Sequence, residues 1–176
     1  MLRQGAFLWD RSTLLTFAVA NHQMNNNMKE AKTIKALQNA TAVDFGPLSE
    51  LNQYELHFGA GMKKNGKVFG GALLGATGGE FSFQSFEPGC EVGFLHTHKT
   101  HEELYFFLSG KGEFQVDGEV FPVGEGSVVR VAPAGKRTIR NNGTEPLIMI
   151  CVQYRGATFT ADDATDGIIL DEKVVW

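Results

Sequence analysis

The sequence predicts an all-β domain built as a sandwich, a barrel or a jelly roll. From residue 54 onward it holds a series of short runs rich in β-branched and aromatic residues, and Gly, Pro, Asn or Asp separates most of them. The chain contains 21 glycines and 14 phenylalanines, a composition that favours tight turns around an apolar core. Short antiparallel strands repeated over about 120 residues are typical of these β folds.

The expected strands follow one another without a long linker. Asp117-Gly118 lies between two of the runs and is a signal for a two-residue hairpin turn. The run from Glu80 to Phe86 alternates aromatic and polar residues, as a strand with one buried face does. The expected strands are YELHF (54–58), KVFGGALLG (67–75), EFSFQSF (80–86), ELYFFLS (103–109), GEFQVDGEVF (112–121), SVVRVA (127–132), TIRN (138–141) and LIMICVQY (147–154).

The N-terminal part differs in pattern from the rest. We expect an N-terminal extension at residues 1–40, partly flexible, followed by a single β domain at residues 41–176. Residues 1–27 are either a genuine extension or a weak signal peptide, because their apolar stretch is short for a signal sequence. Apolar residues at helical spacing within 29–38 predict a short amphipathic helix.

The C-terminal tail, residues 157–176, is acidic at first and then apolar. We expect its large apolar side chains to pack back on the body of the domain or on a neighbouring subunit. These side chains are Ile168, Ile169, Leu170 and Trp176.

The composition argues against several classes of protein. The 16 basic and 20 acidic residues give a net charge of −4, and no basic cluster indicates a nucleic-acid partner. The apolar segments are too short to cross a bilayer, which needs about 20 residues, so we expect no membrane partner. Cys90 and Cys151 are no disulfide framework, which favours a reducing cytoplasm.

Three polar residues just before the apolar run 104–108 suggest a metal site. His96 and His98 are two residues apart, so that on extended backbone their imidazoles point to the same face. Glu103 begins the following strand, and a short turn can bring it opposite the histidines. Two nitrogens and one carboxylate with open positions suit Fe(II) and also accept Mn, Ni, Zn or Co. The alternative is a solvated surface turn.

This segment resembles the cupin family. His96, His98, Glu103 and Gly110 match the first cupin motif, HxHx4Ex6G, although Cys90 stands where that motif has a glycine. The second motif resembles residues 126–142, where Pro133, Gly135 and Asn142 match and the leading glycine, Gly126, is offset by one residue. The resemblance covers roughly residues 54–154 and is closest to small single-domain cupins of the RmlC-like superfamily with a type-2 conserved barrel. It implies a jelly-roll barrel, or double-stranded β-helix, with a divalent metal inside.

The third metal-binding histidine of the family is missing. Its expected position is Thr138, and no histidine follows His101. Three alternatives remain: His96, His98 and Glu103 hold the metal with water or Thr138; His57 reaches in from an earlier strand; or metal binding is weak or absent.

Two residues are candidates for contact with a substrate. Tyr105 shares a strand face with Glu103 and can donate a hydrogen bond to a ligand, or else fill the core. If Thr138 points inward, Arg140 does so too and would favour a carboxylate or phosphate; the alternative is an exposed arginine. Tyr105 and Arg140 are therefore the predicted catalytic residues.

The resemblance implies a metal-dependent enzyme that acts on a small polar or anionic molecule by dioxygenase, decarboxylase or isomerase chemistry. One alternative is a non-catalytic cupin that binds a small ligand or sugar and has a degenerate metal site. Another is a structural dimer whose barrel is filled by phenylalanines. Because the family commonly dimerises through sheet edges, we expect a homodimer.

Overall fold

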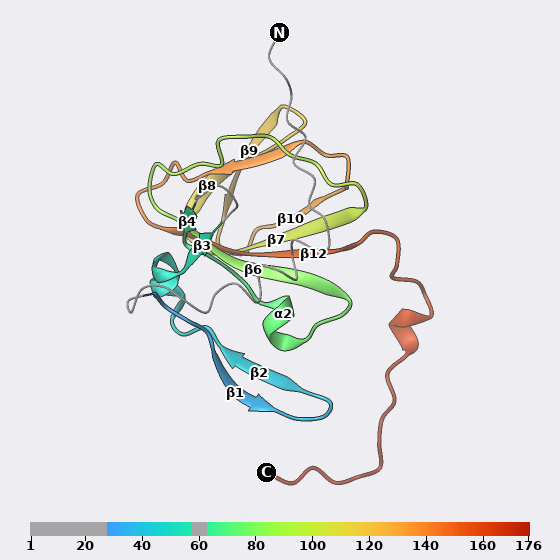
Figure 1. The fold of residues 1–176 in the computed structure, drawn as a ribbon. Coiled ribbons are helices and arrows are strands. Elements are labelled where there is room, and N and C mark those ends of the chain that lie inside the picture. Colours follow the sequence, from blue (N-terminus) through green and yellow to red (C-terminus); the bar gives the residue numbers. More distant parts are fainter. Residues whose placement is uncertain (1–27, 58–62) are drawn as a thin grey trace.

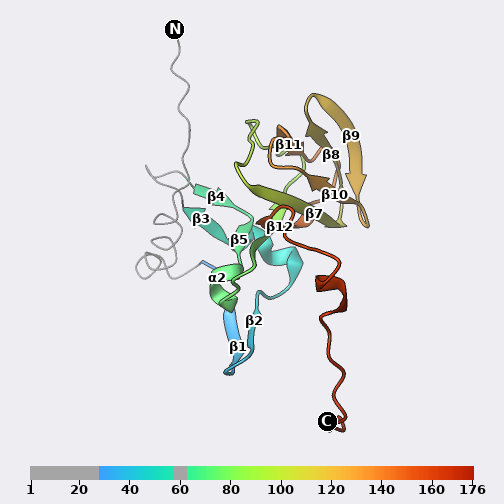
Figure 2. The same ribbon diagram turned by 90° about the vertical axis from the view of Figure 1, so that its right-hand side faces the viewer.

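The computed structural model describes residues 28–57 and 63–176 of the chain. Two antiparallel sheets dominate it and share one core (Figure 1, Figure 2), which confirms the predicted all-β jelly roll. In spatial order, the larger sheet contains β10 (Val128–Val131), β7 (His101–Ser109), β12 (Leu147–Arg155), β6 (Gly79–Phe86) and β5 (Lys67–Phe69). The smaller sheet contains β11 (Arg137–Arg140), β8 (Lys111–Val116) and β9 (Glu119–Gly124).

The barrel lumen is the space between the two sheets, and alternate residues of each strand fill it. In β7, Glu103, Tyr105 and Phe107 are buried, whereas Leu104 and Phe106 are only partly covered. This alternation places one side of the strand in the lumen. The buried core draws on both sheets and comprises Phe86, Tyr105, Phe107, Phe114, Val123, Val131, Ile139, Leu147, Met149 and Cys151.

Two turns show why particular residues are required. Asp117-Gly118 joins β8 to β9 as predicted, with φ angles of 52° and 93°, the positive values of a tight hairpin. Gly110 joins β7 to β8 with a φ of 79°. A Cβ atom at Gly110 would lie 2.3 Å from the carbonyl oxygen of Pro146, so no other residue fits there without displacing the backbone.

A second apolar layer covers the outer face of β6. Phe81 and Phe83 pack around Phe45, with ring centroids 6.1 and 5.2 Å from its ring. The short 3-10 helix η1 (Leu48–Gln53) inserts Leu51 into the same layer. A small hairpin of β3 (Glu55–His57) and β4 (Lys63–Asn65) lies beside these elements.

The N-terminal segment forms a hairpin instead of the predicted helix. β1 (Lys32–Ala36) pairs with β2 (Thr41–Asp44), so the prediction of a helix over 29–38 is wrong. The β-branched Thr33 and Ile34 favour extended backbone, and no apolar surface covers a helical face here, because all of β1 is exposed. The division at residue 40 falls in the turn between β1 and β2 and stays a prediction. Similarly, the run 67–75 is not one strand, since β5 is followed by the short helix α2 (Gly71–Leu74).

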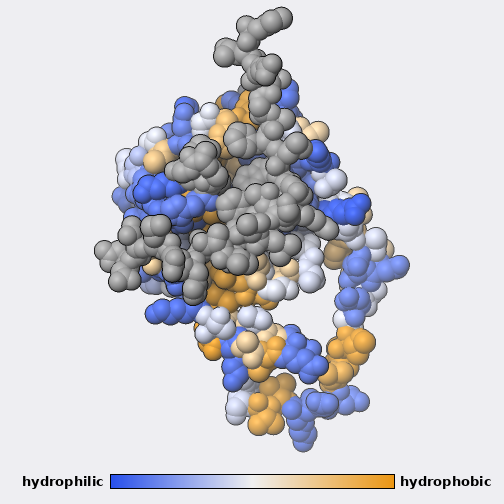
Figure 3. All heavy atoms as spheres, viewed as in Figure 1, coloured by the Kyte–Doolittle hydropathy of each residue, from blue (hydrophilic) through white to orange (hydrophobic). Residues whose placement is uncertain are grey.

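The tail leaves the body after β12 and contains only the short 3-10 helix η3 (Asp163–Thr165) (Figure 1). Its apolar side chains are exposed, so the expectation that they pack back on the same chain is wrong; packing on a neighbouring subunit stays a prediction. Figure 3 shows hydrophobic side chains at the surface at this end of the molecule. Among the described residues, no helix has the length and apolar character needed to span a membrane.

The core makes a direct stability prediction. Phe114 is 1% exposed and its ring centroid lies 4.8 Å from that of Tyr105. Phe114→Ala should lower the free energy of unfolding by about 3–5 kcal/mol, because it removes a buried ring and leaves a cavity. Urea denaturation followed by circular dichroism measures this change.

Phe94→Ala is the matched control, since Phe94 is 67% exposed. We expect that substitution to change stability by no more than about 0.5 kcal/mol. Equal losses for both variants would contradict the placement of Phe114 in the core.

Candidate metal centre

The two histidines lie on the segment that connects β6 to β7, alongside β11. His96 forms an isolated antiparallel bridge with Arg137, and the His98 amide donates to the Pro133 carbonyl at 2.8 Å. These backbone bonds hold the segment extended without making it a regular strand. The imidazole centroids of His96 and His98 are 5.5 Å apart.

The carboxylate of Glu103 reaches the same point from β7. Its Oε1 lies 3.0 Å from His98 Nε2, and its Oε2 lies 3.9 Å from His96 Nε2. Potential ligand atoms of His96, His98 and Glu103 all lie within 4.8 Å of one another. The structure thus brings together the three residues predicted from the sequence, and that they hold a metal stays a prediction.

The donor set fits a divalent transition metal. His96 Nδ1 and His98 Nε2 are buried and have no hydrogen-bond partner, even though His98 Nε2 is close to Glu103. Buried polar atoms are normally satisfied. Imidazole nitrogens beside a carboxylate could gain a partner from such an ion.

Burial, followed by the positive charge of Arg137, lowers the pKa of His96 to about 4. The His96 imidazole is therefore neutral near pH 7. A neutral imidazole is the form that can donate a lone pair to a metal ion.

Glu103 is held by several hydrogen bonds. Gln153 Nε2 donates to Oε1 at 2.6 Å, and the Tyr105 hydroxyl donates to Oε2. Burial of Glu103 opposes its ionisation, but the contact with His98, these hydrogen bonds and the charge of Arg137 together hold its pKa below the usual range. The carboxylate is therefore charged and fixed.

Arg137 is the site residue that sequence reasoning missed. Its Nε and Nη2 donate to Glu103 Oε2 at 2.8 and 2.6 Å, and the two side chains are 1% and 2% exposed. In β11, Arg137 and Ile139 are buried and face the lumen, whereas Arg140 is exposed. The Thr138 hydroxyl donates to the Val92 carbonyl at 2.7 Å.

The alternative in which Thr138 and Arg140 point inward is therefore wrong, and the alternative of an exposed Arg140 is confirmed. Gly126 stands one residue earlier than the spacing of the second cupin motif requires when it is counted from Pro133. When the motif is counted from Gly126 instead, the position of the third metal ligand falls on Arg137. The same count places the asparagine of the motif at Asn141 instead of Asn142. The Asn141 side chain is buried and donates to the Phe86 carbonyl at 2.7 Å. Since strand side chains alternate, a shift of one residue reverses the face of every side chain.

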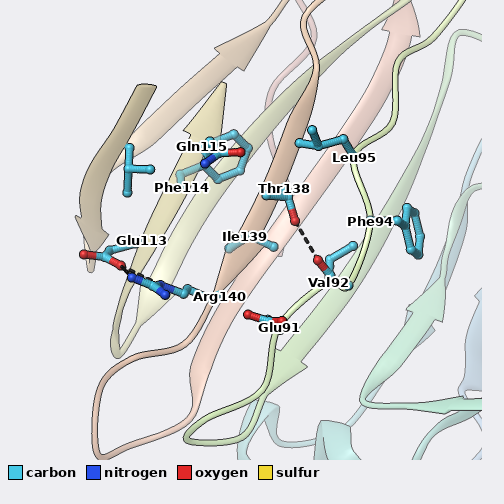
Figure 4. A pocket seen from close by; sticks show the side chains of 12 residues that line it. Glu91, Val92, Phe94, Leu95, Glu113, Phe114, Gln115, Thr138, Ile139 and Arg140 are labelled. Carbon is cyan, nitrogen blue, oxygen red and sulfur yellow. Dashed lines mark hydrogen bonds and ion pairs between the residues drawn. The ribbon is translucent and has the colours of Figure 1, made fainter. Parts of the chain in front are cut away.

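Arg140 lies outside the barrel. Its Nε donates to Glu113 Oε2 at 2.6 Å, and both line a groove of about 420 Å³ between β8, β11 and the segment 91–95 (Figure 4). The groove does not include the histidine cluster. The predicted role of Arg140 in orienting a substrate stays a prediction, as does that of Tyr105, whose hydroxyl is engaged by Glu103.

Neither of the other two described histidines considered as ligands is part of the cluster. His57 Nε2 is 2.9 Å from Glu55 Oε1 and half-exposed, so it does not reach the lumen. His101 is exposed at the start of β7, with its ring centroid 5.9 Å from that of His98.

Comparison with known proteins gives consistent matches. The family model described as "Cupin domain" matches residues 82–153. The crystal structure of a cupin protein from Bacteroides fragilis is 32% identical, with a TM-score of 0.57, over 66% of this chain and 97% of that one.

Two curated proteins match shorter segments. An uncharacterized protein from Methanocaldococcus jannaschii is 38% identical over 60 residues, and an oxalate-binding protein from Thermotoga maritima is 32% identical over 72 residues. The matches cover 34% and 41% of this chain, and the chain spans 48% and 59% of those two proteins.

The lowered pKa of His96 predicts a pH dependence of stability. The pKa of a histidine in the unfolded chain is about 6.5, whereas the pKa of His96 in the folded protein is about 4. Between these values the unfolded state binds the extra proton, so the free energy of unfolding should fall as the pH falls from about 6.5 toward about 4. Urea titrations of chelator-treated protein between pH 7 and pH 5 measure this fall.

His96→Gln should flatten that part of the profile, because glutamine does not titrate. An unchanged pH slope in His96→Gln would show that the dependence arises from other groups.

Proposed function

Because this chain belongs to the cupin family, we propose that it is a metal-dependent enzyme that acts on a small polar or anionic molecule. His96, His98 and Glu103 would hold a divalent transition metal such as Fe, Mn, Ni or Zn. The observation that carries the proposal is the convergence of His96, His98 and Glu103, whose potential ligand atoms all lie within 4.8 Å of one another.

The residues around the cluster hold Glu103 in place and leave the histidines accessible to a ligand from solvent. Tyr105, Gln153 and Arg137 fix the Glu103 carboxylate, and their role in the proposal is to position it. The side chains of His96 and His98 are 36% and 21% exposed, so the cluster is open to solvent on the histidine side. When bound, a metal ion supplies Lewis-acid polarisation of a substrate oxygen.

A small carboxylate is the favoured class of ligand. One matched relative is an oxalate-binding protein. The positive charges of Arg137 and Lys67 both help to lower the pKa of His96, so the cluster lies in a positive field that favours an anion. Dioxygenase, decarboxylase and isomerase chemistry are all compatible with a site of this kind, since the fold does not choose among them.

The second candidate is a non-catalytic cupin that binds a small ligand. Arg137 favours it, because a guanidinium occupies the third-ligand position and already neutralises Glu103. A thermal-shift screen separates the two functions. Stabilisation by organic ligands in the presence of chelator, with none from metals, would support binding alone.

The proposal also includes a homodimer in a reducing cytoplasm. The exposed apolar side chains of the tail support a subunit contact. Cys90 and Cys151 are both free thiols, which is consistent with a compartment that keeps thiols reduced.

Metal content tests the ligand assignment. Protein purified without added metal and dialysed against Mn²⁺, then analysed by plasma emission, should retain a divalent ion. His96→Ala and His98→Ala should each retain at least about tenfold less, because each removes one of three protein ligands.

His57→Ala is the matched control, since His57 lies outside the cluster and pairs with Glu55. We expect its metal content to equal that of the wild type. Unchanged metal content in His96→Ala and His98→Ala would reject the proposed ligands.

A further inference from the structure

The Arg137 guanidinium is fixed on both sides. Nε and Nη2 donate to Glu103 Oε2, and Nη1 donates to the carbonyls of Gly135 at 2.9 Å and Pro133 at 3.4 Å. The side chain is buried and the backbone of the same residue is bridged to His96. Arg137 therefore cannot swing away from the cluster without breaking several hydrogen bonds.

The charge at the cluster is already balanced before any metal binds. Glu103 carries one negative charge and Arg137 one positive charge, and the two are in direct contact. With both imidazoles neutral, as metal ligation requires, the net charge of these four side chains is zero. A divalent ion would then add two positive charges beside the Arg137 guanidinium, and their repulsion is unfavourable because the guanidinium, 1% exposed, is poorly screened by water.

A second cation lies toward the same lumen. Lys67 on β5 is in register with Gln84 of β6, whose side chain is buried in the barrel. The Lys67 ammonium lies 4.7 Å from the centroid of the Phe69 ring, and within the described part of the chain it has no ion-pair partner. Burial lowers the pKa of Lys67, and the negative charge of Glu103 acts in the opposite direction.

We propose that Arg137 weakens metal binding by His96, His98 and Glu103, and that a small dicarboxylate anion bound beside the metal restores the affinity. This inference rests on the proposed function, because it concerns the same centre. The anion enters on the histidine side, where the cluster is open, and offsets the excess positive charge. By thermodynamic linkage, metal and anion then strengthen each other's binding by the same factor.

Equilibrium dialysis at fixed free Mn²⁺ tests the coupling through bound metal per chain, independently of any activity. The probe anion is malonate, and malonamide is its uncharged isostere. For the wild type, saturating malonate should raise Mn²⁺ affinity by about tenfold or more, within the usual range of coupling between sites. Malonamide should have no effect.

The variants show whether the Arg137 charge is the cause. Arg137→Gln should bind Mn²⁺ more tightly than the wild type without anion, and malonate should improve its affinity by less than about threefold. Arg137→Lys keeps the charge and should retain the coupling. Arg130→Gln removes the same charge from β10, where Arg130 is 57% exposed and pairs with Glu102, and should behave as the wild type does.

Equal wild-type affinity in malonate and in malonamide would overturn the inference while leaving the metal centre intact. No Mn²⁺ binding by the wild type under any condition would instead reject the proposed function, and the inference with it. If Arg137→Gln does not fold, Arg137→Met, which also removes the charge, takes its place in the same comparison.

Discussion

The ion pair between Arg137 and Glu103 is the interaction on which the centre of the barrel depends. Glu103 lies on β7 and Arg137 on β11, so the pair joins the larger sheet to the smaller sheet across the lumen. A carboxylate buried this deeply needs a compensating charge and hydrogen bonds, because an unpaired buried charge is strongly destabilising. The guanidinium, Tyr105 and Gln153 provide both. As a result, the carboxylate is fixed in one orientation beside the histidines.

The alternation of side chains that fills the barrel also builds the site. Glu103 shares a strand face with Phe107, and Arg137 shares one with Ile139. The lumen therefore combines the polar cluster with the apolar core. The histidines are the most exposed members of the cluster, so a ligand would approach from their side. Arg140, three residues after Arg137 and so on the opposite face of β11, lines the outer groove instead (Figure 4).

The strands, the Asp117-Gly118 hairpin and the cluster of two histidines and Glu103 could be predicted from the sequence, because they depend on local patterns and short spacings. Arg137 could not be found by counting from Pro133, since the motif is shifted by one residue and such a shift reverses the faces of a strand. The hairpin of β1 and β2 was missed because the same apolar spacing suits a helix, and its pairing partner lies beyond the segment. The path of the tail could not be predicted, because the sequence of residues 157–176 does not specify which surface would cover its apolar side chains.

The most direct test of a metal centre inside this barrel is anomalous diffraction from crystals grown with Mn²⁺ and malonate. An anomalous peak should lie within bonding distance of His96, His98 and Glu103, about 2.0–2.3 Å from each ligand atom, with Arg137 still in the lumen. Absence of any peak at the cluster, with the Arg137–Glu103 pair unchanged and the histidines unliganded, would contradict the presence of a metal centre.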